Sequence, residues 1–172
     1  MEWQQLTWNI FHKISLYYDD TYKDYYITFF ESFTKIIPCE MCRKHYINNI
    51  NNINNNFYKS INEGNIFEWT IDLHNNINAL NNKRLWTYKE AKEFYKNNDI
   101  DLKIFMYKYI KKFRYKENID FLINMIKTIP YIYYEYSKKK ELITFAENFE
   151  LKSENLKDWF IAFIIILNPN LT

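Results

Sequence analysis

Glycine and proline are almost absent from this sequence of 172 residues, which contains one glycine and three prolines. An all-β protein needs frequent turn residues, so this scarcity argues against one. Long apolar runs are also lacking, because the longest, residues 159–167, is less than half of the roughly 20 residues that span a bilayer. We therefore expect an all-α protein without a membrane span.

Charge and cysteine content exclude further classes of protein. Lys and Arg total 23, Asp and Glu total 21, and the two signs are mixed along the chain, so nothing indicates a nucleic-acid partner. Polar residues interrupt the apolar stretches near the N-terminus, unlike a secretory signal peptide. Two cysteines are too few for a secreted disulfide scaffold. We expect a soluble protein of a reducing compartment, the cytoplasm.

Apolar residues recur at helical spacing in four segments. They predict main helices at residues 3–17, 26–37, 39–53 and 66–80. The third overlaps the asparagine-rich segment 48–56. We interpret this segment as a poor helix former that is helical because its isoleucines pack. A short fifth helix should follow Thr87, because Glu90 stands three residues on in capping-box spacing. Short connections between these helices suggest a four-helix bundle with a short fifth helix.

The sequence changes character after residue 98. From Ile100 onward it contains no Cys, His or Gly, and its Tyr, Phe, Lys and Ile residues are patterned as further helices with Pro130 as the clearest break. We expect residues 1–98 to form one domain and residues 99–172 a helical extension with a packing role.

Cys39 and Cys42 form a CxxC pair at the predicted start of the third helix. The helix N-terminus favours thiolates and so suits dithiol–disulfide exchange. Two buried structural thiols are an equally good interpretation of the spacing alone. Haem attachment is excluded, because Arg43 rather than His follows Cys42. A thioredoxin-like site would need a βαβ setting, which the helical periodicity does not provide.

A zinc site is a third interpretation. Cys39, Cys42 and His45 could be three ligands, with His12 or His74 as the fourth. The sequence offers no second closely spaced ligand pair, which structural zinc sites usually have. A zinc-stabilised helical binding module nevertheless stays open as an alternative, as does a structural helical virion protein with neither cofactor nor metal.

Two predicted helices each carry a histidine beside their apolar stripe. His12 follows Trp8 by one turn, and His74 precedes Asn78 by one turn, with Asn75 next to it. Imidazoles, amides and an indole near a bundle interior would suit a planar, hydrogen-bonding ligand. Taken singly, each is uninformative: a lone core histidine is usually structural, and Trp69 is most simply a core residue.

Together the motifs "WNIFH", "PCEMCRKHY" and "WTIDLHNNINALNNK" resemble the Erv/ALR family of FAD-linked sulfhydryl oxidases, most of all those of large DNA viruses. The resemblance covers about residues 3–96. It implies an FAD-binding bundle in which Cys39 and Cys42 are the catalytic redox disulfide, with Cys42 beside the flavin. It also implies a set of cofactor-binding residues: Trp8, His12, His45, Tyr46, His74, Asn75, Asn78, Leu80, Lys83 and Trp86.

The implied activity is oxidation of thiols in a substrate protein, with electrons passed through FAD to oxygen to give hydrogen peroxide. Many members of the family carry an additional shuttle pair of cysteines, which this sequence lacks. The substrate dithiol would then reach the active disulfide directly, or a thioredoxin-like protein would relay electrons. A homodimer would be noncovalent. The expected location is the host cytoplasm or the virion if the protein is viral.

Overall fold

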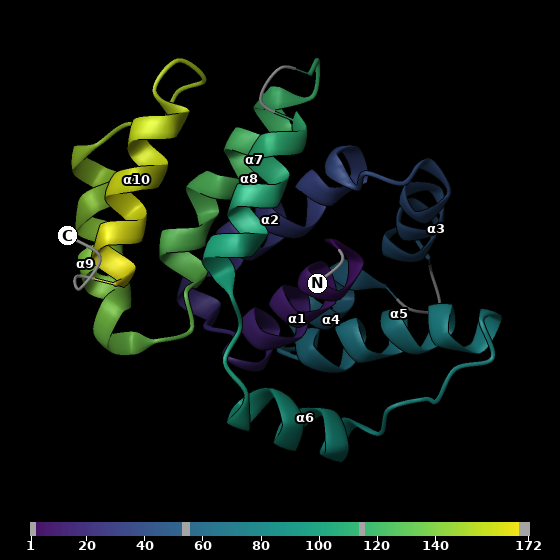
Figure 1. Cartoon of the computed structure of the whole chain (residues 1–172). Helices are drawn as coiled ribbons and strands as arrows, with labels where there is room; N and C mark the ends of the chain where they lie inside the picture. Colours follow the sequence, from purple (N-terminus) through teal and green to yellow (C-terminus); the bar gives the residue numbers. More distant parts are fainter. Residues whose placement is uncertain (1–2, 53–55, 114–115, 169–172) are drawn as a thin grey trace.

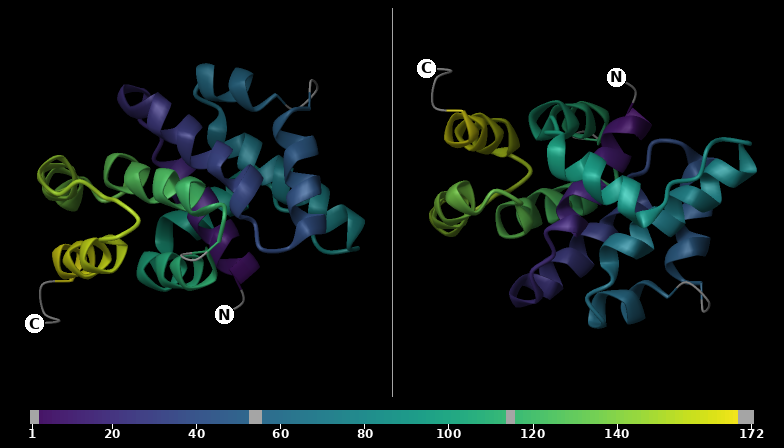
Figure 2. Two further views of the ribbon diagram at one scale, coloured as in Figure 1. Left: turned by 90° about the horizontal axis from the view of Figure 1, so that it is seen from above. Right: turned by 90° about the horizontal axis from the view of Figure 1, so that it is seen from below.

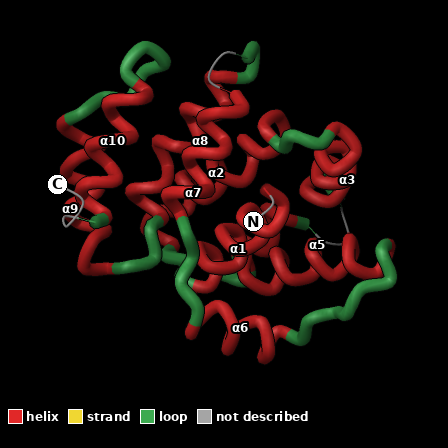
Figure 3. Tube along the Cα trace, viewed as in Figure 1, coloured by secondary structure: helices red, strands yellow, loops and turns green. Residues whose placement is uncertain are grey.

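The computed structural model describes residues 3–52, 56–113 and 116–168, and every regular element in these ranges is helical (Figures 1 and 3). The first part contains α1 (Trp3–Leu16), α2 (Lys23–Ile36), α3 (Glu40–Ile50), α4 (Phe57–Asn62), α5 (Ile66–Leu80) and α6 (Tyr88–Asn97), with a 3₁₀ turn at Asp20–Tyr22. The second contains α7 (Leu102–Phe113), α8 (Ile119–Ile132), α9 (Tyr136–Asn148) and α10 (Leu156–Leu167). The all-α prediction is confirmed. None of the described helices is both long and apolar enough to cross a membrane.

Aromatic side chains fill the centre of the bundle formed by α1, α2, α3 and α5. Phe11 of α1 packs edge-on against Phe33 of α2, with ring centroids 4.6 Å apart. Trp69 of α5 is buried against Phe30 and Phe57, which confirms it as a core residue. Edge-to-face contacts of this kind add to the stabilisation from burial itself.

The asparagine-rich segment does not continue the third helix as predicted. α3 ends at Ile50, Asn51 is its C-cap, and Asn52 lies outside it, whereas residue 53 falls outside the described residues. The short helix α4 follows and was not predicted. Its N-cap is Asn56, whose side-chain oxygen accepts a hydrogen bond from the Lys59 backbone N–H at 3.1 Å. Asparagine side chains compete for backbone hydrogen bonds, and so favour helix ends over helix interiors.

The fifth helix of the prediction is α6, and its capping box is confirmed. Thr87 Oγ1 accepts from the Glu90 N–H at 3.2 Å, and the Glu90 carboxylate accepts from the Thr87 N–H at 3.1 Å. The other end of α6 is held by the buried ammonium of Lys13 on α1. It donates to the carbonyls of Tyr95 at 2.8 Å and Asn98 at 2.9 Å, which complements the partial negative charge of a helix C-terminus.

The extension is helical; its first two helices pack on the bundle, and its last two lie outside them. α7 lies on α1, α8 lies along α2, α9 packs on α8, and α10 packs on α9 at the edge of the molecule (Figures 1 and 2). The predicted break at Pro130 is wrong, because Pro130 lies inside α8 and the helix ends at Ile132. Proline has no backbone N–H, so α8 lacks one helical hydrogen bond at this position, and it ends two residues further on.

The apolar core continues across residue 98. Phe105 and Tyr109 of α7 pack on Phe33 of α2, with ring centroids 6.3 Å and 5.6 Å away. The Tyr109 and Thr7 hydroxyls share a buried hydrogen bond of 2.8 Å. The extension therefore contributes side chains to the same core as the bundle.

If α7 is part of this core, Phe105→Ala should lower the free energy of unfolding by about 3–5 kcal/mol. The melting temperature should fall on the order of 10 °C. The matched control is Tyr107→Ala on the same helix, because Tyr107 is half exposed and its loss should cost less than about 0.5 kcal/mol. Equal melting temperatures for the two variants would contradict the shared core.

Candidate active site

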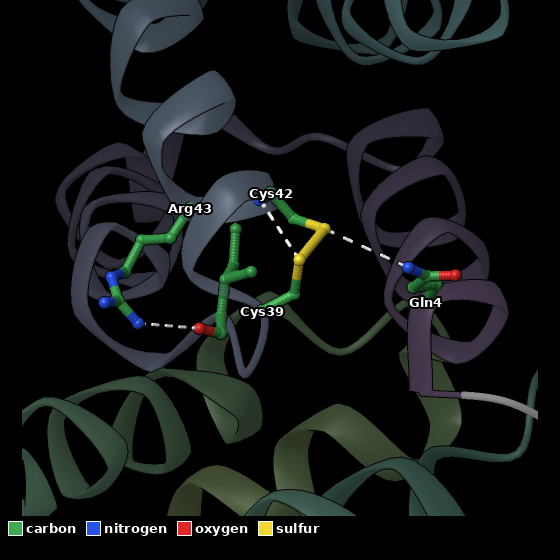
Figure 4. Close-up of a disulfide and its surroundings, with 5 residues drawn as sticks. Gln4, Cys39, Cys42 and Arg43 are labelled. Carbon is green, nitrogen blue, oxygen red and sulfur yellow. Dashed lines mark hydrogen bonds between the residues drawn. A yellow bond between two sulfur atoms is a disulfide. The ribbon is translucent and has the colours of Figure 1, made fainter. Parts of the chain in front are cut away.

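Cys39 and Cys42 form a disulfide at the N-terminus of α3, with Cα atoms 5.2 Å apart (Figure 4). Cys39 is the N-cap, and its Sγ accepts a hydrogen bond from the Cys42 N–H at 3.2 Å. Arg43 holds the preceding loop by donating to the Ile37 carbonyl at 3.0 Å. Both cysteines are partly exposed, so the interpretation as two buried thiols is wrong.

One face of α1 runs from this disulfide toward the two histidines. Gln4 Nε2 lies 3.9 Å from Cys42 Sγ and donates toward it (Figure 4). Trp8 and His12 follow Gln4 by one and two turns on the same face, and each four-residue step rises about 6 Å along the helix. Cys42 also packs against the apolar core, so its sulfur is on the interior side of the disulfide.

His12 and His74 join α1 to α5 through a hydrogen bond between their side chains. His12 Nε2 lies 2.9 Å from His74 Nδ1, and His12 Nδ1 lies 3.0 Å from the Thr70 hydroxyl. The Trp8 indole is parallel to the His74 ring, with centroids 4.3 Å apart and an interplanar angle of 3°. The Tyr95 ring of α6 lies 4.8 Å from His12 on centroids. The result is a stack of the Trp8, His12 and His74 rings between α1 and α5, with the tilted Tyr95 ring of α6 at its side.

Burial keeps both imidazoles neutral at pH 7. It holds the pKa of His12 well below its usual value, and the neighbouring His74 lowers it further. Burial lowers the pKa of His74 to about 4, with a smaller contribution from the Lys83 ammonium. A neutral imidazole has one N–H donor and one acceptor nitrogen. Each of these two rings can therefore donate one hydrogen bond through one nitrogen and accept through the other.

Asn75 and Asn78 hold the loop that follows α5. The Asn75 amide donates to the Trp86 carbonyl and accepts from the Trp86 N–H, both at 2.8 Å. Asn78 Nδ2 donates to the Arg84 carbonyl at 3.2 Å. The loop turns at Asn82, which has a positive φ of 52°. Both amides therefore fold the loop back and fix the Trp86 backbone beside α5.

The other predicted site residues occupy different environments. Lys83 is exposed, but its ammonium lies close enough to His74 to lower the pKa of that imidazole. Leu80 is 71% exposed. His45 is partly buried on α3. Tyr46 is a core residue whose hydroxyl donates to the Phe30 carbonyl at 2.8 Å. The structure thus brings Trp8, His12 and His74 into contact. It joins Asn75 and Asn78 to the loop that contains Trp86. Tyr46 lies in the core, and Leu80 lies in solvent.

A model of the Erv1/Alr family matches residues 5–97. The chain belongs to this family. The match spans more than half of the chain and includes the disulfide, the histidine pair and the loop held by Asn75 and Asn78. It ends close to the sequence change at residue 98.

Relatives of this Erv1/Alr chain in large DNA viruses are described as FAD-linked sulfhydryl oxidases. A "Probable FAD-linked sulfhydryl oxidase" of Acanthamoeba polyphaga mimivirus is 33% identical over 96 residues, covering 54% of this chain and 67% of the relative. An "FAD-linked sulfhydryl oxidase" of African swine fever virus is 28% identical over 102 residues, covering 57% of this chain and 83% of the relative. No solved structure matches the chain significantly.

The side chains at the site suit the FAD of these relatives. The stacked rings of Trp8 and His74 supply aromatic groups that can line a flavin, and the Lys83 ammonium offers charge for phosphate. His74 Nε2 has no hydrogen-bond partner among the residues that the structure describes. The set does not suit a metal ion, because no three His, Cys, Asp or Glu side chains in the described ranges lie close enough to share one.

Sequence reasoning missed four residues of this site: Gln4, Ser15, Thr70 and Tyr95. Gln4 precedes Trp8 by four residues and Thr70 precedes His74 by four, so helical spacing contained a signal for both. Ser15 Oγ lies 3.1 Å from Thr70 Oγ1. Nothing in the sequence pairs Ser15 with Thr70 or Tyr95 with His12, because those contacts depend on how α1 packs against α5 and α6.

The neutral histidine pair predicts a loss of stability in acid. Below pH 6.5 the unfolded chain protonates these imidazoles, whereas folded His74 stays neutral to about pH 4. The unfolded state then binds more protons, so the free energy of unfolding should fall as the pH is lowered. For His74 alone the fall between pH 7 and 5 should be up to about 2 kcal/mol.

Urea unfolding of the wild type and of His74→Gln at pH values from 5 to 7 measures this dependence. The slope of stability against pH should be smaller in His74→Gln. Asn76→Ala on the same helix is the control and should keep the wild-type slope, since Asn76 is exposed and carries no titratable group. An unchanged slope in His74→Gln would show that the pair is not held neutral.

Proposed function

We propose that this chain is an FAD-dependent thiol oxidase that makes disulfides in a substrate protein and passes the electrons to oxygen, giving hydrogen peroxide. Membership of the Erv1/Alr family and the viral relatives support this class of activity. The main observation behind this proposal is that one face of α1 contacts both the disulfide and His74. Gln4 on that face contacts Cys42, and Trp8 and His12 on it meet His74, so the CxxC disulfide and a cluster of aromatic rings adjoin one helix.

The exchange step begins with a substrate thiolate attacking Cys39 Sγ. A substrate–Cys39 disulfide forms, the Cys39–Cys42 bond breaks, and Cys42 leaves as a thiolate. A second substrate thiolate then attacks the substrate sulfur, so that the substrate disulfide forms and Cys39 is released. The Cys42 N–H and the N-terminus of α3 stabilise negative charge on Cys39, and the Gln4 amide stabilises it on Cys42.

Trp8, His12, His74 and Trp86 would line the cofactor pocket, Lys83 would serve its phosphates, and Asn75 and Asn78 would hold the loop that closes it. Bound there, FAD would accept the electron pair of the Cys39–Cys42 dithiol and deliver it to oxygen. Cys42 is the cysteine that would face the flavin, because its sulfur lies on the side of α1. Direct contacts from His45, Tyr46 and Leu80 stay predictions.

The donor of electrons is a dithiol from another protein. This sequence contains no cysteine besides Cys39 and Cys42, so it has no internal pair that could relay electrons to the disulfide. A thioredoxin-like protein with an exposed dithiol fits this requirement. We propose further that any homodimer is noncovalent and that the protein works in the host cytoplasm or the virion.

A zinc module is the weaker candidate. Its ligands would be Cys39, Cys42 and His45, with His12 or His74 as the fourth. The two cysteine sulfurs instead form a disulfide, and the two candidate fourth ligands are hydrogen-bonded to each other. A structural virion protein would not need a CxxC pair beside a hydrogen-bonded cluster of histidine and tryptophan rings.

Cys39→Ser and Cys42→Ser should each abolish oxygen uptake driven by a small dithiol, because neither variant can form the disulfide. Both should stay folded and yellow, and only Cys39→Ser should leave a thiolate at Cys42 that alters the flavin spectrum. Met41→Ser is the control, since Met41 is exposed between the cysteines and no step uses it. Full turnover in both cysteine variants would disprove the redox role.

Trp8→Ala and His74→Ala should lower the amount of FAD that copurifies with the protein, because they remove the stacked rings of the pocket. The ratio of flavin to protein absorbance measures this. Added FAD should also raise their melting temperatures less than that of the wild type. Tyr136→Ala, which removes a ring that is 90% exposed, should retain wild-type FAD. Equal FAD content in all of these proteins would place the cofactor elsewhere.

A further inference from the structure

The hydroxyl of Thr70 is the inner end of a hydrogen-bond chain that reaches His74. Thr70 Oγ1 donates to the Phe67 carbonyl at 2.8 Å, and a carbonyl can only accept. It has two other neighbours, which are His12 Nδ1 at 3.0 Å and the Ser15 hydroxyl at 3.1 Å. Ser15 can itself donate to the His12 carbonyl at 3.1 Å. A hydroxyl has a single proton. The Phe67 carbonyl is the nearest acceptor, so we place the proton there, and Thr70 then accepts from His12.

The direction of every later bond follows from this one. His12 Nδ1, 3.0 Å from Thr70 Oγ1, must carry a proton and donate it. Since the ring is neutral, its Nε2 has a lone pair and accepts from His74 Nδ1 at 2.9 Å. His74 Nδ1 therefore carries the only proton on that ring, and its Nε2 is left with a lone pair.

That lone pair is available to a ligand. Among the described residues, no buried side-chain nitrogen or oxygen lacks a partner, yet His74 Nε2 has none there. The atom is therefore accessible rather than sealed in the core. It belongs to the ring that stacks on Trp8, so it lies at the edge of the proposed cofactor pocket.

We propose that Thr70 is a positioning residue that fixes both histidines in the Nδ1–H form, so that His74 presents an acceptor to the cofactor. The inference rests on the proposed function, because it assumes that FAD occupies this pocket. His74 then selects an O–H or N–H group of the cofactor, such as a hydroxyl of its sugar chain. Phosphate and carbonyl oxygens carry no proton and cannot bond to this nitrogen, which leaves phosphate to Lys83.

Two-bond ¹H–¹⁵N correlation spectra of the FAD-loaded protein at pH 7 test the proposal directly, because they identify which ring nitrogen carries the proton. His45→Gln and His12→Gln assign the signals. The expected result is a neutral Nδ1–H form for both His12 and His74. An Nε2–H form or an imidazolium at either position would overturn the proposal.

Two variants test the role of Thr70. Thr70→Ser keeps the hydroxyl and should keep the tautomers and bind FAD within about twofold of the wild type. Thr70→Val has nearly the same shape without the hydroxyl, so His12 should no longer hold its proton on Nδ1 exclusively. Its FAD dissociation constant should rise about tenfold, the effect of one lost hydrogen bond. Wild-type tautomers in Thr70→Val would overturn the positioning role.

The two proposals fail in different ways. A protein that takes up no FAD would refute the proposed function through its visible spectrum. The nitrogen spectra report the protonation of His12 and His74 whether or not the protein turns over substrate, so they test the tautomers separately from activity.

Discussion

The hydrogen bond between His12 and His74 is the constraint on which the site depends. Two imidazoles can share such a bond at 2.9 Å only if at least one of them is neutral, and burial makes both neutral. The bond sets the distance and rotation between α1 and α5. It also holds the rings flat against Trp8. The same contact therefore serves the fold and prepares a surface for a planar ligand.

Helix α1 connects this contact to the rest of the molecule. One face meets Cys42 through Gln4 and carries Trp8 and His12, whereas Thr7 bonds to Tyr109 of the extension and Lys13 bonds to the end of α6. A shift of α1 would disturb all of these contacts together. The extension therefore supports the helix that links the disulfide to the pocket, although the family match ends before it.

Local patterns predicted much of the fold and some of the site. Apolar periodicity located α1, α2 and α5, and the Thr87–Glu90 capping box located α6, because both signals lie within a few residues. The sequence did not predict α4, because asparagine can cap a helix or continue one and only packing decides which. Motifs identified His12 and His74 as site candidates. Their direct bond could not be predicted, because it depends on how α1 packs against α5.

One disulfide and one flavin should exchange electrons as a unit in this protein. Anaerobic titration of the purified protein with dithionite, followed by its visible spectrum, tests this most directly. We expect a yellow protein that consumes two electron pairs per flavin, one for the Cys39–Cys42 disulfide and one for FAD. Consumption of a single pair, or a protein that binds no flavin, would contradict it.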